Sequence, residues 1–235
     1  MVDTNAPSAL TDVPAHFHRD APQDAHQVRR HRAVLALLKE VSGEVLDYGC
    51  GYGDLTHAMS RTHPRVTGVD VDPQRIAFAR REYPELRFEA CPENGLTFAD
   101  ASFDIVTSVV VLPFVPDARE YLREVHRVLR PLGHLIVATK TWPLLRRAYR
   151  RFRYGPRAAG PRATSLTLHS VDAIAALLET SGFTVLRRTA FYDPPFSNHK
   201  NFADLLNGSV ELVGEALNLV EPAPYPLLLA RRTDA

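Results

Sequence analysis

Hydrophobic residues follow two different spacings along the first half of the chain. From 24 to 41 they recur at helical spacing, which predicts a helix that leads into the rest of the fold. After it, short apolar runs alternate with segments of helical period, the pattern of an α/β protein with a mainly parallel sheet. The runs that predict strands are 44–49, 65–70, 86–91 and 103–112, and the segments that predict helices are 54–62 and 72–83.

The second half continues the alternation with longer connections. Residues 117–129 have the amphipathic pattern of a helix, the "RPLG" sequence that follows predicts its end, and 134–139 predict a strand. A helix over 170–182 would start at the cap Ser170 and stop at Gly182. The last two predicted strands are 183–192 and 225–232. We expect an N-terminal tail over 1–23 and one domain over 24–235.

Composition narrows the function. The chain has 235 residues, with 28 Lys and Arg against 27 Asp and Glu, so its net charge of +1 gives no general reason to bind nucleic acid. The two cysteines, Cys50 and Cys91, are too few for a disulfide framework, and neither has zinc-site spacing, so we expect no metal. No apolar stretch reaches membrane-spanning length, which favours a cytoplasmic protein.

The stretch "VLDYGCGYGDLT" at 45–56 carries the chemistry. Glycines at three alternate positions, Gly49, Gly51 and Gly53, allow a sharp turn from strand to helix and bring bare backbone close to a ligand. A dinucleotide site would need a glycine where Asp54 stands, and Asp47 would repel a pyrophosphate. A carboxylate at this corner suits a ligand that presents an ammonium group, as the methionine end of S-adenosylmethionine does.

The segment "LDYGCGYG" resembles the D-x-G-x-G-x-G motif of class I S-adenosylmethionine-dependent methyltransferases. The similarity extends in order over about 30–191, and it is closest to the branch that acts on small molecules and quinone-like lipids. It implies a Rossmann-like α/β fold, in which a mainly parallel seven-stranded sheet has helices on both faces. It also implies that S-adenosylmethionine is the cofactor, with the ribose on Asp70. The cofactor-binding residues that it implies are Asp47, Gly49, Gly51, Gly53, Asp70, Val71, Glu93 and Val109.

Three positions depart from the family pattern. Pro92 stands where an acid commonly contacts adenine, so Glu93 or Asn94 would have to take that role. Phe114 stands where many relatives have a histidine, so no general base can be transferred to this chain, and "RPLG" replaces a common P-G-G turn. The catalytic residue is therefore not identified. Four side chains could reach the carboxyl edge of the sheet: His31, His169, Tyr192 and His199.

Two further segments are expected on the substrate side. The Arg-rich segment, 140–165, carries a charge of +8 between 140 and 162. It could contact an anionic membrane, an anionic substrate or solvent alone, and nucleic acid is disfavoured. The insertion at 193–224 has a largely helical pattern and could line a pocket or join two copies in a homo-oligomer.

The resemblance predicts a methyltransferase for a small-molecule or lipid-linked acceptor, which could be anionic, with oxygen or carbon favoured over nitrogen as the methylated atom. "DPPF" at 193–196 resembles a signature of amino-group methyltransferases, but that signature follows the fourth strand, whereas here it follows the sixth predicted strand. A proline turn is favoured. Two alternatives stay open: a nucleotide-dependent oxidoreductase and a non-catalytic module that binds the cofactor.

Overall fold

The computed structural model describes residues 25–93, 95–139, 171–192 and 224–233. The predicted tail, the Arg-rich segment and all but the last residue of the predicted insertion lie outside the described residues, as do His169, His199 and the "DPPF" sequence.

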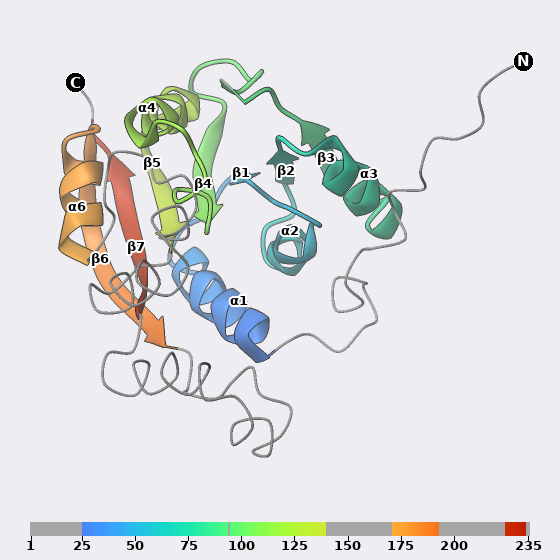
Figure 1. Ribbon diagram of the computed structural model, residues 1–235, viewed down its shortest axis with the longest axis horizontal. Coiled ribbons are helices and arrows are strands. Elements are labelled where there is room, and N and C mark those ends of the chain that lie inside the picture. Colours follow the sequence, from blue (N-terminus) through green and yellow to red (C-terminus); the bar gives the residue numbers. More distant parts are fainter. Residues whose placement is uncertain (1–24, 94, 140–170, 193–223, 234–235) are drawn as a thin grey trace, which may run out of the picture.

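Seven strands form one twisted sheet in the order β3-β2-β1-β4-β5-β7-β6 (Figure 1). The pairs among β1 to β5 are parallel, while β7 runs antiparallel to both β5 and β6. The mainly parallel seven-stranded sheet expected from the sequence is therefore confirmed. The strands are β1 Val45–Tyr48, β2 Val66–Asp70, β3 Arg87–Ala90, β4 Phe103–Val109, β5 Leu129–Ala138, β6 Phe183–Tyr192 and β7 Pro224–Arg232.

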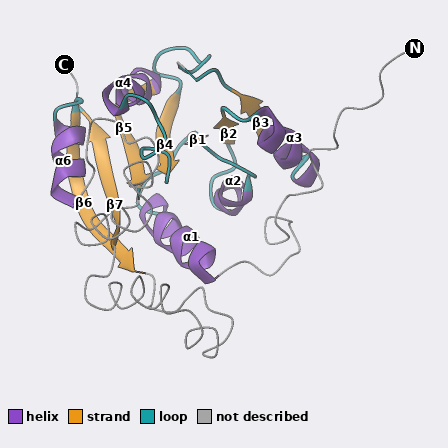
Figure 2. Ribbon diagram, viewed as in Figure 1, coloured by secondary structure: helices purple, strands orange, loops and turns teal. Residues whose placement is uncertain are grey.

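Helices cover both faces of the sheet (Figure 2). On one face, α4 and α6 pack their apolar residues against Leu46, Val106 and Leu135 of the central strands. On the other face, α1 and α2 cover the alternate residues of the same strands, Val45 and Ile105 among them, and α3 covers a smaller cluster. Burial on both faces explains why these strands read as continuous apolar runs. The described helices are α1 Ala25–Leu38, α2 Asp54–Ser60, α3 Pro73–Glu82, α4 Ala118–Val128 and α6 Val171–Glu179.

Local signals in the sequence fix the helix ends. The carboxylate of Asp72 accepts hydrogen bonds from the backbone N–H groups of Gln74 and Arg75 and so caps the start of α3. Asp117 caps α4 in the same way. Gly182 has a φ of +86°, a conformation that suits glycine, just after α6 ends.

Two predicted boundaries were wrong by several residues. We predicted β4 to run to 112, but it ends at Val109, because Val110 takes a φ of +60° and turns the chain. "RPLG" was expected to lie in a turn before a strand at 134. Instead β5 begins at Leu129, which pairs with Phe103, and the register then shifts before His134 pairs with Ile105. An irregularity within the strand replaces the expected turn.

Among the described residues, no helix is long and apolar enough to cross a membrane. The same residues contain no cluster of three potential metal ligands, and both cysteines are free and buried.

Candidate functional site

The candidate site lies at the carboxyl edge of the sheet, where β1 sits between β2 and β4. The chain leaves β1 toward β2 on one side, and β4 lies on the other side, so the strand order reverses at this point. Ligands of open α/β sheets bind in the crevice outside such a reversal. The glycine-rich segment 49–53 connects β1 to α2 at this edge.

Asp47 is buried at the centre of this edge, with 2% of its surface exposed. Its Oδ2 accepts a hydrogen bond of 2.6 Å from the hydroxyl of Thr56 in α2, and its Oδ1 accepts one of 2.8 Å from the hydroxyl of Thr107 in β4. The carboxylate thus holds together the strand before the glycine segment, the helix after it and the neighbouring strand. Each oxygen keeps a lone pair for a further donor.

Burial raises the pKa of Asp47 to about 6, although the Thr56 and Thr107 hydroxyls and the nearby His31 act to lower it. Hydroxyl groups carry no charge, and no Arg or Lys of the described ranges pairs with this carboxylate. A charge in a medium of low dielectric without a counter-ion is costly, which is what the raised pKa expresses. A cationic ligand at this point would relieve that cost.

The three glycines of the segment have positive φ angles of 83°, 57° and 85°, but they serve different ends. A Cβ on Gly49 would lie 2.3 Å from Cγ2 of Val111, and one on Gly53 would lie 2.8 Å from the ring of Phe88. Gly49 and Gly53 have no room for a side chain, because Val111 and Phe88 already fill the space beside them. A Cβ on Gly51 would meet no atom within 4 Å, so the open space beside Gly51 is available to a ligand.

Asp70 ends β2 and is also buried, with 5% exposed. Its Oδ2 accepts a hydrogen bond of 2.9 Å from the backbone N–H of Gly51, and its Oδ1 accepts one of 2.9 Å from that of Asp72. The carboxylate therefore fixes the backbone of the glycine segment beside the open space. Its free lone pairs can still accept donors such as hydroxyl groups.

Val110 is a backbone outlier at this edge. A β-branched residue rarely adopts a φ of +60°, and such strain tends to collect at functional sites. The backbone N–H of Val110 donates a hydrogen bond of 2.7 Å to the carbonyl of Ala138 in β5, which helps to hold the turn. The turn places Val111 against Gly49, so the end of β4 closes over the start of the glycine segment.

A second polar cluster joins α1 to the start of α2. Nε2 of His31 lies 3.0 Å from Oδ2 of Asp54, and Nε2 of Gln27 donates a hydrogen bond of 2.7 Å to the same oxygen. Burial alone would raise the pKa of Asp54, but the hydrogen bond and charge of His31 hold it below its ordinary value. Both partners of Asp54 are buried, at 4% exposed each. His31, a candidate base in the sequence, is thus engaged with a carboxylate.

The remaining predicted residues occupy less enclosed positions. Val71 follows β2 and is 49% exposed, Glu93 is exposed in the connection after β3, and Val109 is half-buried at the end of β4. Phe114, in the turn after β4, is 67% exposed. Tyr192 is the last residue of β6. Since β5 and β6 are both antiparallel to β7, β6 runs parallel to β5, and Tyr192 ends it at the same edge as the others. All of these residues lie at or just after the carboxyl end of β2, β3, β4 or β6, so the topology brings them to one edge.

Sequence reasoning missed the two hydroxyl partners of Asp47. Thr107 lies in a strand that reads as core, and Thr56 lies inside a short helix, so nothing local singles out either one. Val111 was also missed, because it lies against Gly49 only once the chain turns at Val110. Thr107 lies 60 positions from Asp47, so that contact cannot be found from sequence spacing and only the sheet register reveals it.

Comparisons with known proteins identify the family. A family model described as a methyltransferase domain matches residues 46–137, which include both acids and the glycine segment. The chain is 34% identical over 192 residues to a demethylmenaquinone methyltransferase of Tropheryma whipplei, covering 72% of this chain and 78% of that protein. It is 32% identical over 162 residues to a ubiquinone/menaquinone biosynthesis C-methyltransferase of Desulfotalea psychrophila, covering 60% of this chain and 66% of that protein, slightly under two thirds.

Solved structures show the same fold. The geranyl diphosphate C-methyltransferase from Streptomyces coelicolor superposes with a TM-score of 0.67 over 88% of this chain and 79% of its own. That protein was crystallised with Mg²⁺, geranyl diphosphate and S-adenosyl-L-homocysteine. Its identity to this chain is 15%, so the likeness bears on the fold alone.

Proposed function

This chain belongs to the class I S-adenosylmethionine-dependent methyltransferases, and from that membership we propose that it methylates a carbon or oxygen of a quinone-like, lipid-linked ring. It is a methyltransferase with S-adenosylmethionine as its cofactor and a small molecule as its acceptor. The identity of the acceptor and the atom that receives the methyl group are the parts that we propose.

The buried carboxylate of Asp47 carries the assignment of the cofactor site. S-adenosylmethionine is positively charged at its sulfonium and at its ammonium group. Asp47 is hydrogen-bonded by two neutral hydroxyls, and burial raises its pKa to about 6. A cation bound in the open space beside Gly51 would therefore stabilise its ionised form. A pyrophosphate there would add a second negative charge, which argues against the oxidoreductase alternative.

The cofactor supplies an electrophilic methyl group on a good leaving group, so the residues of the chain need mainly to position and to exclude water. Asp70 holds the N–H of Gly51 and has lone pairs left for the ribose hydroxyls. Val111 closes the end of β4 over Gly49. In this proposal the edge between β2 and β4 aligns the methyl group with the acceptor.

Two observations support an apolar acceptor. The relatives of 34% and 32% identity are named for demethylmenaquinone and for ubiquinone/menaquinone biosynthesis. Phe114, a large apolar residue that is 67% exposed, stands at the carboxyl edge, where an apolar ring or tail could cover it. Removal of a proton from the acceptor falls to a group not yet assigned, since Asp54 already engages His31.

The test has two parts. Calorimetry should detect binding of S-adenosylmethionine and S-adenosylhomocysteine but not of NADH. The protein should then transfer a labelled methyl group to a demethylated naphthohydroquinone in detergent, and NMR of the product should distinguish a ring methyl from a methoxy group. Binding without transfer to any hydroquinone, phenol or carboxylate would favour the non-catalytic alternative, and tight NADH binding would overturn the cofactor assignment.

We also propose that the Arg-rich segment binds an anionic membrane surface or an anionic acceptor and so brings the acceptor to the site. The segment lies outside the described residues, and its charge of +8 between 140 and 162 supports the idea. Replacing Arg146, Arg147, Arg150 and Arg151 by Ala should reduce binding to vesicles that contain anionic lipid. Unchanged vesicle binding together with unchanged turnover would remove the proposal.

A further inference from the structure

The connection from β3 to β4, residues 91–102, crosses the sheet, and its described residues, all but 94, contain no helix. It starts at the carboxyl edge and must reach the opposite edge, where β4 begins, crossing over β2 and β1 on the way. Helical crossovers satisfy their own backbone N–H and C=O groups, whereas an irregular one must find other partners for those that are buried. We call residues 91–102 the crossover.

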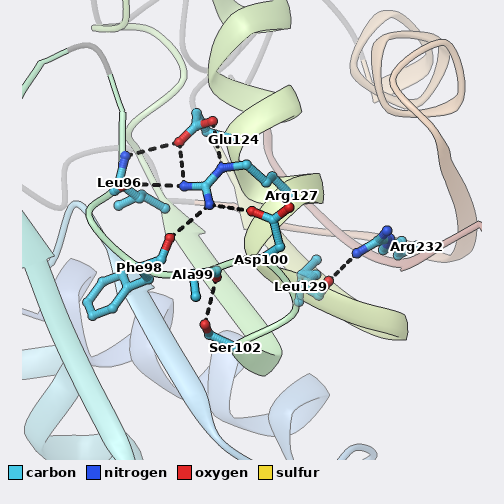
Figure 3. A network of polar contacts seen from close by, with 9 residues as sticks. All are labelled: Leu96, Phe98, Ala99, Asp100, Ser102, Glu124, Arg127, Leu129 and Arg232. Carbon is cyan, nitrogen blue, oxygen red and sulfur yellow. Dashed lines mark hydrogen bonds and ion pairs between the residues drawn. The ribbon is translucent and has the colours of Figure 1, made fainter.

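Two side chains of α4 supply those partners (Figure 3). The guanidinium of Arg127 donates hydrogen bonds to the carbonyls of Leu96, at 3.0 Å, and Phe98, at 2.8 Å. The carboxylate of Glu124 accepts a hydrogen bond of 3.1 Å from the N–H of Leu96. A Cβ on Gly95 would lie only 3.1 Å from Oε2 of Glu124, so the lack of a side chain there lets the crossover approach the helix.

All the hydrogen-bond donors of Arg127 can be used. Besides the two carbonyls, its guanidinium donates to the carboxylate of Glu124, at 3.0 and 2.9 Å, and to the carboxylate of Asp100, at 2.8 Å, which makes five hydrogen bonds for five N–H groups. The hydrogen bond from Arg127 holds the pKa of Glu124 below its ordinary value. The pair therefore stays charged on both sides across the neutral pH range.

The upstream end of the crossover lies beside the ribose-binding acid that we propose. The N–H of Cys91 donates a hydrogen bond of 3.0 Å to the carbonyl of Asp70, so residues 91–93 leave the sheet next to that carboxylate. Pro92, which has neither an acidic side chain nor an N–H, cannot make the polar contact to a purine that an acid makes elsewhere in the family. The sequence offers Glu93 or Asn94 for the purine instead, and both belong to the crossover, so the course of the crossover decides whether either can reach the purine.

We infer that Arg127 and Glu124 are positioning residues for the purine of the cofactor, acting through the crossover. The inference rests on the proposed cofactor site, since it takes the ribose to lie on Asp70. The helix α4 is anchored in the core by Leu122, Val125 and Val128, which are fully buried, so it is a rigid support for the crossover. A loosened crossover should weaken the adenosine half of the cofactor and leave the methionine half unaffected.

The experiment compares two ligands and two arginines. S-adenosylhomocysteine carries both halves of the cofactor, while 5′-methylthioadenosine carries the adenosine half without the amino acid. In Arg127→Gln, we expect the Kd of both ligands to rise by a similar factor, about tenfold or more, because a small misplacement of a contact is costly. Arg127→Lys keeps a charge but loses the planar fork, and we expect an intermediate rise.

Arg130→Gln is the matched control. Arg130 also pairs with acids, Asp104 at 2.6 Å and Glu44 at 3.8 Å, but these lie at the amino ends of β4 and β1, away from the site. It should lower the melting temperature without changing either Kd. The inference is overturned if Arg127→Gln and Arg127→Lys both bind the two ligands within twofold of the wild type, or if Arg130→Gln weakens them equally. Failure of the wild type to bind either ligand would instead overturn the proposed function.

Discussion

The two edges of the sheet each use an aspartate to tie β1 to β4, but they treat its charge in opposite ways. At the amino edge, Asp104 of β4 accepts a hydrogen bond of 2.8 Å from the backbone N–H of Glu44, just before β1, and pairs with Arg130 at 2.6 Å. At the carboxyl edge, Asp47 of β1 accepts hydrogen bonds from the hydroxyls of Thr107 and Thr56.

The pKa values report the difference. Burial tends to raise the pKa of Asp104, but the Glu44 N–H and Arg130 together hold it below its ordinary value. Burial dominates at Asp47 and raises its pKa to about 6. At the amino edge the carboxylate of Asp104 has an arginine as its ion-pair partner. At the carboxyl edge the described residues provide no Arg or Lys for the carboxylate of Asp47. The second arrangement makes sense where a cationic ligand is to bind.

The largest effect should come from Asp47→Asn, which removes the charge but keeps the shape. We expect the Kd of S-adenosylhomocysteine to rise about hundredfold, as when one partner of a buried charge pair is removed. The free protein should not be destabilised. A pKa raised from 3.8 to about 6 corresponds to a cost of about 3 kcal/mol for keeping Asp47 ionised at neutral pH, and asparagine avoids it.

Calorimetry and chemical denaturation of the free protein measure the two halves of this prediction. The amide can still accept a hydrogen bond from one threonine and donate one to the other, so the joint between β1 and β4 is preserved. A large loss of stability in Asp47→Asn with normal ligand binding would show that Asp47, like Asp104, serves only the fold.

The glycines sharpen the comparison within the carboxyl edge. Gly49→Ala should destabilise the protein by about 2–4 kcal/mol, because the new Cβ would lie 2.3 Å from Cγ2 of Val111 and φ is +83°. Gly51→Ala meets no atom and should cost about 1–2 kcal/mol, from its left-handed backbone alone, but should weaken cofactor binding.

Denaturation of both variants, and of Gly49→Ala combined with Val111→Ala, tests this division. The double variant removes the clash and should recover part of the lost stability, which a double-mutant cycle would record as coupling between the two residues. Equal stability loss in Gly49→Ala and Gly51→Ala, with equal binding, would contradict the assignment of Gly51 to the ligand.

The sequence could predict the acids and glycines of the site because their signals are local. Asp47 and Asp70 end apolar runs, and the three glycines follow one of them directly. It could not predict that Asp47 has no Arg or Lys partner among the described residues, because Thr56 and Thr107 are brought to it by strand pairing and helix packing. The early end of β4 could not be predicted either, because valine favours strands and only the positive φ of Val110 ends this one.

The role of α4 was equally hidden from the sequence. The pattern of 117–129 predicts an amphipathic helix, and the structure confirms one over Ala118–Val128. A pair of opposite charges three residues apart, such as Glu124 and Arg127, usually means only a surface ion pair. What distinguishes this pair is the chain 28 to 31 positions earlier, whose backbone at Leu96 it satisfies.

The pH dependence of cofactor binding should show a smaller difference between Asp47 and an aspartate of ordinary pKa. If the cofactor needs ionised Asp47, its Kd should rise about tenfold between pH 7 and pH 5, because the pKa of Asp47 in the free protein is about 6. An aspartate with an ordinary pKa would stay ionised over that range. Calorimetry at a series of pH values measures the slope, and Asp47→Asn should abolish it.

Raising the pH should tighten cofactor binding but lower the stability of the free protein. Folded protein holds a proton on Asp47 more tightly than unfolded chain does, so this group lowers the free energy of unfolding as the pH rises from about 4 to about 6. His31 and Asp54 are the titratable groups beside it, so His31→Gln is the control. A slope that persists in Asp47→Asn and vanishes in His31→Gln would assign the titration to the histidine.

The smallest effect should come from Asp104→Asn, the counterpart of the first variant at the amino edge. The Glu44 N–H would keep an acceptor but Arg130 would lose its closest charge, and because the pair is partly exposed we expect a loss of about 1 kcal/mol in the free energy of unfolding. The pKa of Asp104 is lowered in the folded protein, so its contribution is present above the ordinary pKa and is lost as the pH falls through the folded one. Binding of S-adenosylhomocysteine should stay unchanged. If Asp104→Asn weakened the ligand as much as Asp47→Asn did, both aspartates would act through the shared β1 and β4 pairing, and the electrostatic difference between the edges would have no bearing on the cofactor.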